Sequence, residues 1–141
     1  MHIYTFHSAA GLAGIVENSI HNPGEPRHFM TVTEQNHLWH AEINKIRIAS
    51  SDKTLDLREV GYNIYDRMIY FPSVSIKWHF LEENSKTTSC PLKGKTKYYN
   101  FSSGETFVAN VAWSYSLTIP EAIKIRSYVA FDTKKILLSH S

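Results

Sequence analysis

The feature that most constrains the fold is a succession of short β-rich segments, separated by regular turn signals, that begins near Thr31. Aromatic and β-branched residues are frequent in these segments, and both favour strands. The breaks between them contain the Gly, Pro, Asn and Asp residues that turns require. Many short strands with little helix predict a mainly β domain. We expect a small antiparallel barrel or folded sheet with one or two short helices.

The turn signals divide this region into individual elements. Residues 38–43 and 46–49 form an expected hairpin around Asn44 and Lys45, because Asn tolerates the positive φ of a tight turn. The remaining expected elements are strands at residues 54–60 and 68–71, a hairpin of residues 95–101 and 106–115, a short helix from Pro120 through Ile125, and a last hairpin of residues 128–131 and 136–138.

Alternation of apolar and polar residues assigns side chains to the two faces of each strand. Residues 74–80 alternate regularly and predict a half-buried strand, with Trp78 on its apolar face. The odd-numbered residues of the strand at 106–115 include Val111 and Trp113. This shared apolar face predicts that Trp113 packs in the core.

The first thirty residues have a different pattern. Residues 8–20 place apolar side chains at helical spacing, with Ser8 as a candidate cap, and predict a short helix. Residues 21–26 contain the Pro and Gly of a turn and suit a linker. We therefore divide the chain into an N-terminal extension, residues 1–30, and a single β domain, residues 31–141.

Composition narrows the classes of partner and compartment. The formal net charge is only +2 and no concentrated basic stripe is present, so a nucleic-acid partner is not expected. Cys90 is the only cysteine and cannot form an internal disulfide, and no apolar run has the length of a transmembrane helix. We expect a cytoplasmic protein without a membrane partner. The eight histidines are scattered, so no metal and no cofactor are expected.

The residues best suited to chemistry lie in the turn at residues 90–94. Cys90 is a weak catalytic candidate, because a thiol nucleophile needs a lowered pKa and a lone cysteine usually packs as a small apolar residue. Lys93 is a candidate contact for an anionic group, and Gly94 would let the backbone approach that group closely. The alternative is a tight turn with a solvated lysine.

Tyrosines near this turn could line a pocket for a planar ligand. Tyr98 and Tyr99 are neighbours on one strand and point to opposite faces, so only one of them can line a given cavity. We name Tyr99 and Tyr115 as candidate ligand contacts, together with Lys93 and Gly94, because a phenol combines a flat ring with a polar hydroxyl.

Several motifs, in order along the chain, support a family resemblance. They are residues 46–59, 69–72, 81–82, 87–94, 98–99, 110–115 and 128–131. Together they resemble the family known as domain of unknown function 427, sometimes labelled nucleotidyltransferase-like, over residues 38–138. The resemblance implies a small antiparallel β domain akin to the β-tent folds, without their zinc-binding cysteines. The label implies nucleotidyl transfer, which normally needs clustered carboxylates for Mg²⁺. The four aspartates Asp52, Asp56, Asp66 and Asp132 are dispersed.

The chain departs from the family pattern at four positions. Members of the family often carry an aromatic residue where Leu92 stands and a histidine where Ser89 stands. They often have an acidic or histidine pair at Ser85 and Lys86. If those polar residues carry chemistry in other members, the resemblance implies that this chain has lost or changed it.

These observations lead to one functional hypothesis and two alternatives. The hypothesis is a β-domain protein that binds a small anionic or planar molecule near the turn at residues 90–94. One alternative is an enzyme, either nucleotidyltransferase-like or dependent on the Cys90 thiol. The other is an interaction module, such as a homodimer, that uses exposed aromatic side chains and sheet edges.

Overall fold

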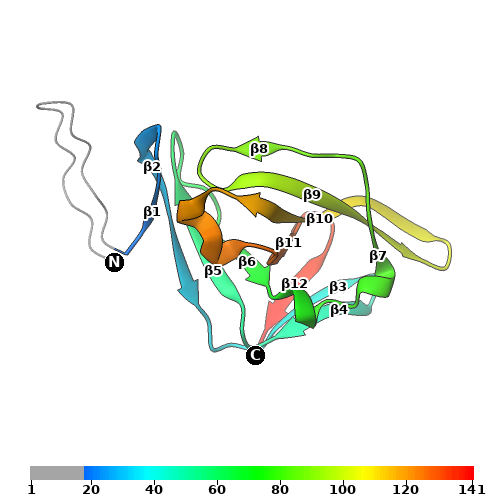
Figure 1. The fold of residues 1–141 in the computed structure, drawn as a ribbon. Coiled ribbons are helices and arrows are strands. Elements are labelled where there is room, and N and C mark those ends of the chain that lie inside the picture. Colours follow the sequence, from blue (N-terminus) through cyan, green and yellow to red (C-terminus); the bar gives the residue numbers. More distant parts are fainter. Residues whose placement is uncertain (1–17) are drawn as a thin grey trace, which may run out of the picture.

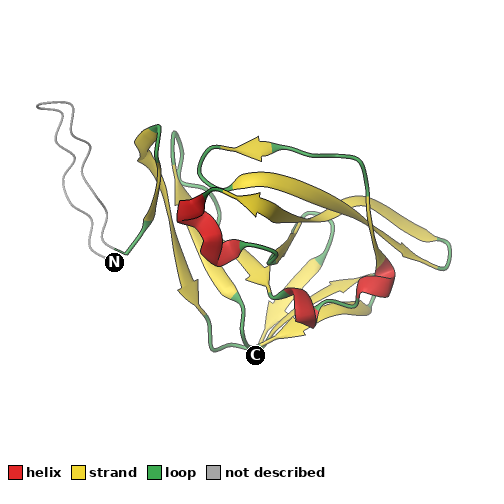
Figure 2. Ribbon diagram, viewed as in Figure 1, coloured by secondary structure: helices red, strands yellow, loops and turns green. Residues whose placement is uncertain are grey.

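The computed structural model describes residues 18–141 and is mainly β (Figures 1 and 2). The expected helix at residues 8–20 lies almost entirely outside this part of the chain. The strands are β1 (Ile20–Asn22), β2 (Glu25–Glu34), β3 (Trp39–Ile43), β4 (Ile46–Ser51), β5 (Leu55–Val60), β6 (Met68–Phe71), β7 (Leu81–Glu83), β8 (Ser89–Cys90), β9 (Gly94–Ser103), β10 (Thr106–Thr118), β11 (Val129–Phe131) and β12 (Leu137–His140). The short 3₁₀ helices are η2 (Ser73–Ser75), η3 (Trp78–Phe80) and η4 (Pro120–Ile125).

Nine strands form one folded antiparallel sheet, and three form a second sheet. The order in the large sheet is β1-β2-β5-β6-β11-β10-β9-β7, with β8 also pairing with β9. The small sheet has the order β12-β3-β4 and lies below β9 and β10 in Figure 1. The large sheet folds without closing into a barrel, so the folded-sheet form of the prediction is correct. No helix within residues 18–141 is long and apolar enough to cross a membrane.

Most of the predicted hairpins and strands are confirmed. Asn44 and Lys45 form the turn between β3 and β4 with φ values of 48° and 66°, the left-handed region that such a turn needs. β5, β6 and the long β9–β10 hairpin occupy the expected segments, and a 3₁₀ helix begins at Pro120. Local turn chemistry therefore sets the positions of most strands in both sheets.

Two groups of buried residues stabilise the fold. The inter-sheet core lies between the two sheets and includes Trp39, Phe71, Phe101 and Phe131. The η4-side core lies on the other face of the large sheet, and its residues come from β2, β5, β6, β10, β11, η4 and the turn at Leu92. One face of the large sheet therefore packs against the small sheet, and the other packs against η4 and the turn at Leu92.

The strand predicted at residues 74–80 is wrong, because this segment forms η2 and η3 instead. Hydrogen bonds from Ser75 N to Pro72 O (2.9 Å) and from Phe80 N to Lys77 O (3.1 Å) close the two turns. The indole N–H of Trp78 donates to Ser73 O at 2.9 Å. The regular alternation was misleading because these apolar residues do not share a buried face: Ile76 is buried, whereas Val74 and Trp78 are exposed.

The last predicted hairpin is also wrong. β11 pairs with β10 and β6 in the large sheet, whereas β12 pairs with β3 in the small one. Between them, the N–H groups of Lys135 and Ile136 both donate to Asp132 O. This turn redirects the chain out of one sheet and into the other.

The β1–β2 hairpin joins the described part of the expected extension to the large sheet. Residues 21–26 contain its turn, where Gly24 N donates to Asn22 Oδ1 at 2.9 Å, so this turn chemistry connects two strands and not two separate units. β2 then pairs with β5 from Phe29 through Glu34. The expected boundary between residues 30 and 31 thus falls inside β2.

Candidate functional site

A cavity of about 430 Å³ lies against β5, β6, β9 and β10. Its wall combines aromatic rings with an ion pair, which is the mixture typical of small-molecule sites. The lining side chains that matter most are Glu59, Tyr70, Lys93, Tyr98, Trp113 and Tyr115.

A bulge in β10 decides which aromatic residues face this cavity. The pairing of β10 with β9 shifts register between Val108 and Ala112, and Asn110 has a φ of 51°. After the bulge, Val111 packs in the inter-sheet core, whereas Trp113 and Tyr115 face the η4-side core and the cavity. The predicted face shared by Val111 and Trp113 is therefore wrong, although Trp113 does pack, partly buried, against the η4-side core.

The Asn110 bulge is held by amide side chains. Asn84 donates to the side-chain oxygens of both Asn100 (2.7 Å) and Asn110 (2.8 Å), and the Asn110 N–H donates to Asn100 Oδ1 (3.0 Å). These bonds satisfy groups that a bulge leaves unpaired. The network links β9 and β10 to the segment that follows β7, and it fixes the point at which β10 changes face.

Lys93 and Glu59 form a largely buried ion pair at the cavity wall. His28 Nε2 lies 2.8 Å from the other carboxylate oxygen of Glu59, which makes a chain of three polar side chains. Burial alone would raise the pKa of Glu59, but Lys93 and His28 outweigh it and lower that pKa. Burial alone would lower the pKa of Lys93, but Tyr115 and Glu59 raise it. Both partners are therefore held in their charged forms at neutral pH.

Tyr115 places a hydroxyl in the cavity that lacks a protein partner. The residue is only 7% exposed, yet its hydroxyl forms no hydrogen bond with any side chain or backbone group of residues 18–141. Burial raises its pKa, so the phenol stays protonated and can donate. The Lys93 ammonium lies 5.8 Å from the centre of its ring, a favourable cation–π distance.

The rest of the aromatic wall comes from Tyr98, Trp113 and Tyr70. The Tyr98 and Trp113 rings lie 6.2 Å apart, and Lys86 Nζ lies 4.6 Å from the centre of the Tyr98 ring. Burial raises the pKa of Tyr70, and the nearby indole N–H of Trp113 opposes that rise only in part. The Tyr98 and Trp113 rings give the cavity two flat surfaces beside the polar groups of Lys93, Glu59 and Tyr115.

Tyr99 lies on the opposite face of β9, away from this cavity. It is 8% exposed, belongs to the inter-sheet core, and shares a 3.0 Å hydrogen bond with Ser114. Its ring meets Trp78 edge-on at 5.2 Å. Of the two adjacent tyrosines, Tyr98 therefore reaches the cavity.

Gly94, Leu92 and Cys90 support the turn and do not line the cavity. Gly94 has a φ of 130°, and a Cβ there would lie 2.1 Å from Leu117 O. Leu92 is fully buried in the η4-side core, and Cys90 packs partly buried against it. The backbone of Gly94 thus allows close contact with β10, which positions the neighbouring Lys93.

The structure brings together two of the four candidate ligand contacts, Lys93 and Tyr115. Sequence reasoning missed Glu59 as the partner of Lys93, because the two residues are 34 positions apart and only the folded sheet brings them together. Strand alternation did contain the signal for Tyr98, since it required one of the two adjacent tyrosines to face away from the other.

The positions that depart from the family pattern are mostly at the surface. Ser85, Lys86 and Ser89 are exposed, and Lys86 contacts the Tyr98 ring at the cavity rim. Within residues 18–141, no three His, Cys, Asp or Glu side chains are grouped so that they could hold a metal ion.

Comparisons with known proteins bear on the family of this chain. No curated protein matches the sequence. One family model matches residues 31–139, which run from within β2 to within β12 and include every cavity-lining residue named above. Because this match covers well over half of the sequence, the chain belongs to the family described as Domain of unknown function (DUF427).

Proposed function

We propose that the protein binds a small planar molecule in the cavity beside Lys93 and Tyr115. The observation that carries this proposal is the Tyr115 side chain: the residue is only 7% exposed, and its hydroxyl has no hydrogen-bond partner within residues 18–141 at the wall of the cavity. A ligand with an acceptor at this point would form a hydrogen bond that no protein group already occupies.

The shape and charge of the wall favour a flat ligand with a neutral polar edge. Tyr98 and Trp113 offer ring surfaces on which a planar molecule can stack. Lys93 is already neutralised by Glu59, so a multiply charged anion would have to compete with that carboxylate. A single acceptor can approach Tyr115 and Lys93 while the ion pair stays intact.

The test is a thermal-shift screen of planar metabolites, followed by calorimetric titration of any molecule that stabilises the protein. The Tyr115→Phe variant is expected to bind such a molecule about tenfold more weakly, because it loses one buried hydrogen bond. Tyr99→Phe is the matched control, since it removes a hydroxyl from the opposite face of the same hairpin. Its affinity for the ligand should equal that of the unaltered protein.

Two results would contradict the proposal. One is a screen in which no planar molecule raises the melting temperature. The other is an affinity that Tyr115→Phe leaves unchanged, which would place the ligand elsewhere on the protein.

A further inference from the structure

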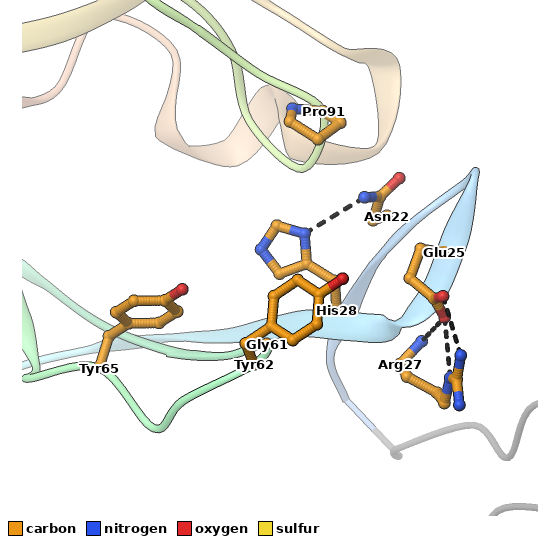
Figure 3. A pocket seen from close by; sticks show the side chains of 8 residues that line it. All are labelled: Asn22, Glu25, Arg27, His28, Gly61, Tyr62, Tyr65 and Pro91. Carbon is orange, nitrogen blue, oxygen red and sulfur yellow. Dashed lines mark hydrogen bonds and ion pairs between the residues drawn. The ribbon is translucent and has the colours of Figure 1, made fainter.

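A second, larger cavity of about 700 Å³ lies where the β1–β2 hairpin meets the loop after β5 and the turn at Pro91 (Figure 3). It shares Tyr65 with the first cavity, and its His28 is bonded to Glu59 of that cavity. The function proposed above makes no use of this second site.

Exposed aromatic rings form one side of the second cavity. Tyr62 is fully exposed and Tyr65 is about half exposed, although both stand at a concave surface. In Figure 3 the Tyr62 ring lies just below the His28 imidazole, and the Tyr65 ring lies to the left of both. The face of an aromatic ring is electron-rich and attracts weakly positive C–H groups. Such rings are therefore suited to stack against the C–H face of a sugar.

The polar side chains of the cavity are paired so that their charges cancel. Arg27 donates to Glu25 through Nε (3.0 Å) and through Nη2 (3.1 Å). His28 accepts from Asn22 at Nδ1 (3.2 Å) and lies against Glu59 through Nε2 (2.8 Å). A site with balanced charge has little long-range attraction for ions. It still offers guanidinium N–H donors and carboxylate acceptors, which suit hydroxyl groups.

Further contacts hold Asn22 and His28 in place before any ligand arrives. Asn22 is buried, and it both accepts from Gly24 N (2.9 Å) and donates to His28. Gly61 lets the loop approach His28 closely, since a Cβ there would lie 3.3 Å from the imidazole. This part of the wall is therefore preformed and loses little conformational entropy when a ligand binds.

We propose that this second cavity binds a neutral sugar, with Tyr62 stacked on its C–H face and with Arg27 and Glu25 bonded to its hydroxyls. The side chains assigned to the sugar are distinct from those of the planar-ligand cavity, because neither Tyr62 nor Arg27 lines that cavity.

The test is an NMR titration of the full chain with glucose, with cellobiose and, as a charged probe, with inorganic phosphate. We expect saturable shifts of the Arg27 and Gly61 amides with at least one of the sugars. Tyr62→Ala should weaken this binding about tenfold, as expected for the loss of one stacked ring. Phe107→Ala is the control, because Phe107 is an exposed ring outside both cavities, and it should leave the affinity unchanged.

Three outcomes would overturn the inference. They are the absence of saturable shifts at these amides, an unchanged sugar affinity in Tyr62→Ala, and tighter binding of phosphate than of either sugar at the same residues. Tyr115→Phe separates the two proposals, since it should weaken the planar ligand and leave the sugar affinity unaltered.

Discussion

The two faces of the β9–β10 hairpin bury tyrosines with opposite consequences. On the inter-sheet face, Tyr99 is packed among apolar side chains and its hydroxyl is bonded to Ser114. On the cavity face, Tyr115 is buried to the same degree, but its hydroxyl meets open space. Burial alone therefore does not distinguish a structural tyrosine from a binding one. The distinguishing property is whether the hydroxyl has a partner.

The two faces also differ in charge. The inter-sheet core consists of buried hydrophobic residues, whereas the cavity face holds the Lys93–Glu59 pair. Charge held inside a protein needs partners and close packing around it. The inter-sheet face should therefore dominate stability, and the cavity face should dominate ligand binding.

The largest expected effect is on the inter-sheet face. Phe101→Ala should lower the free energy of unfolding by about 4 kcal/mol, because it leaves a large hole in a fully buried site. Tyr98→Ala removes a half-buried ring from the cavity face and should cost only about 1 kcal/mol. Urea denaturation of both variants measures the difference. Equal losses would show that the cavity face is as important for stability as the core.

The Lys93–Glu59 pair should give the next largest effect. Lys93→Met leaves a buried carboxylate with only His28 as a partner, and about 3 kcal/mol of stability should be lost. The double variant Lys93→Met/Glu59→Leu should lose less than the sum of the two single variants. Additive losses, measured by the same denaturation, would rule out a direct interaction between the two side chains.

The same pair predicts how stability depends on pH. The pKa of Glu59 is lowered in the folded protein, so its contribution is present above the ordinary value of 4.5 and is lost as pH falls through the lowered pKa. The pKa of Lys93 is raised, so its contribution is present below the ordinary value of 10.5 and is lost as pH rises through the raised pKa. Melting temperatures of Lys93→Met should consequently fall less steeply at both extremes than those of the unaltered protein.

A smaller effect separates the two tyrosines directly. Tyr99→Phe should cost about 1 kcal/mol, because it leaves the Ser114 hydroxyl buried without its partner. Tyr115→Phe removes a hydroxyl that has no protein partner, so the stability of the ligand-free protein should change by less than about 0.5 kcal/mol. Thermal melts of both variants provide the measurement. A large loss in Tyr115→Phe would reveal a structural role for that hydroxyl.

The smallest expected effect is that of Cys90→Ala. The thiol is partly buried and lies outside the cavity wall, so about 0.5–1 kcal/mol of stability should be lost and the affinity for a planar ligand should stay the same. Calorimetric titration of the variant is the check. A loss of binding would bring the thiol into the site.

Where the chain signals its structure locally, sequence reasoning was successful. The turn at Asn44 and Lys45, the strand at residues 68–71 and the start of η4 at Pro120 all depend on residues that are neighbours in sequence. It failed at residues 74–80, where the alternating segment forms two 3₁₀ turns. It also failed at β12, which pairs in the small sheet with β3, a strand about a hundred residues earlier in the chain, and not with its sequence neighbour β11.

The site shows the same division. The sequence by itself determined the class of the fold, most strand positions, and the fact that Tyr98 and Tyr99 face opposite ways, because these follow from turn chemistry and from the two-residue period of a strand. Only the tertiary structure decided that Tyr98 faces the cavity and that Lys93 pairs with Glu59. The bulge at Asn110 places Trp113 beside Tyr98, and the folding of the large sheet brings Glu59 to Lys93. Both depend on contacts between residues far apart along the chain.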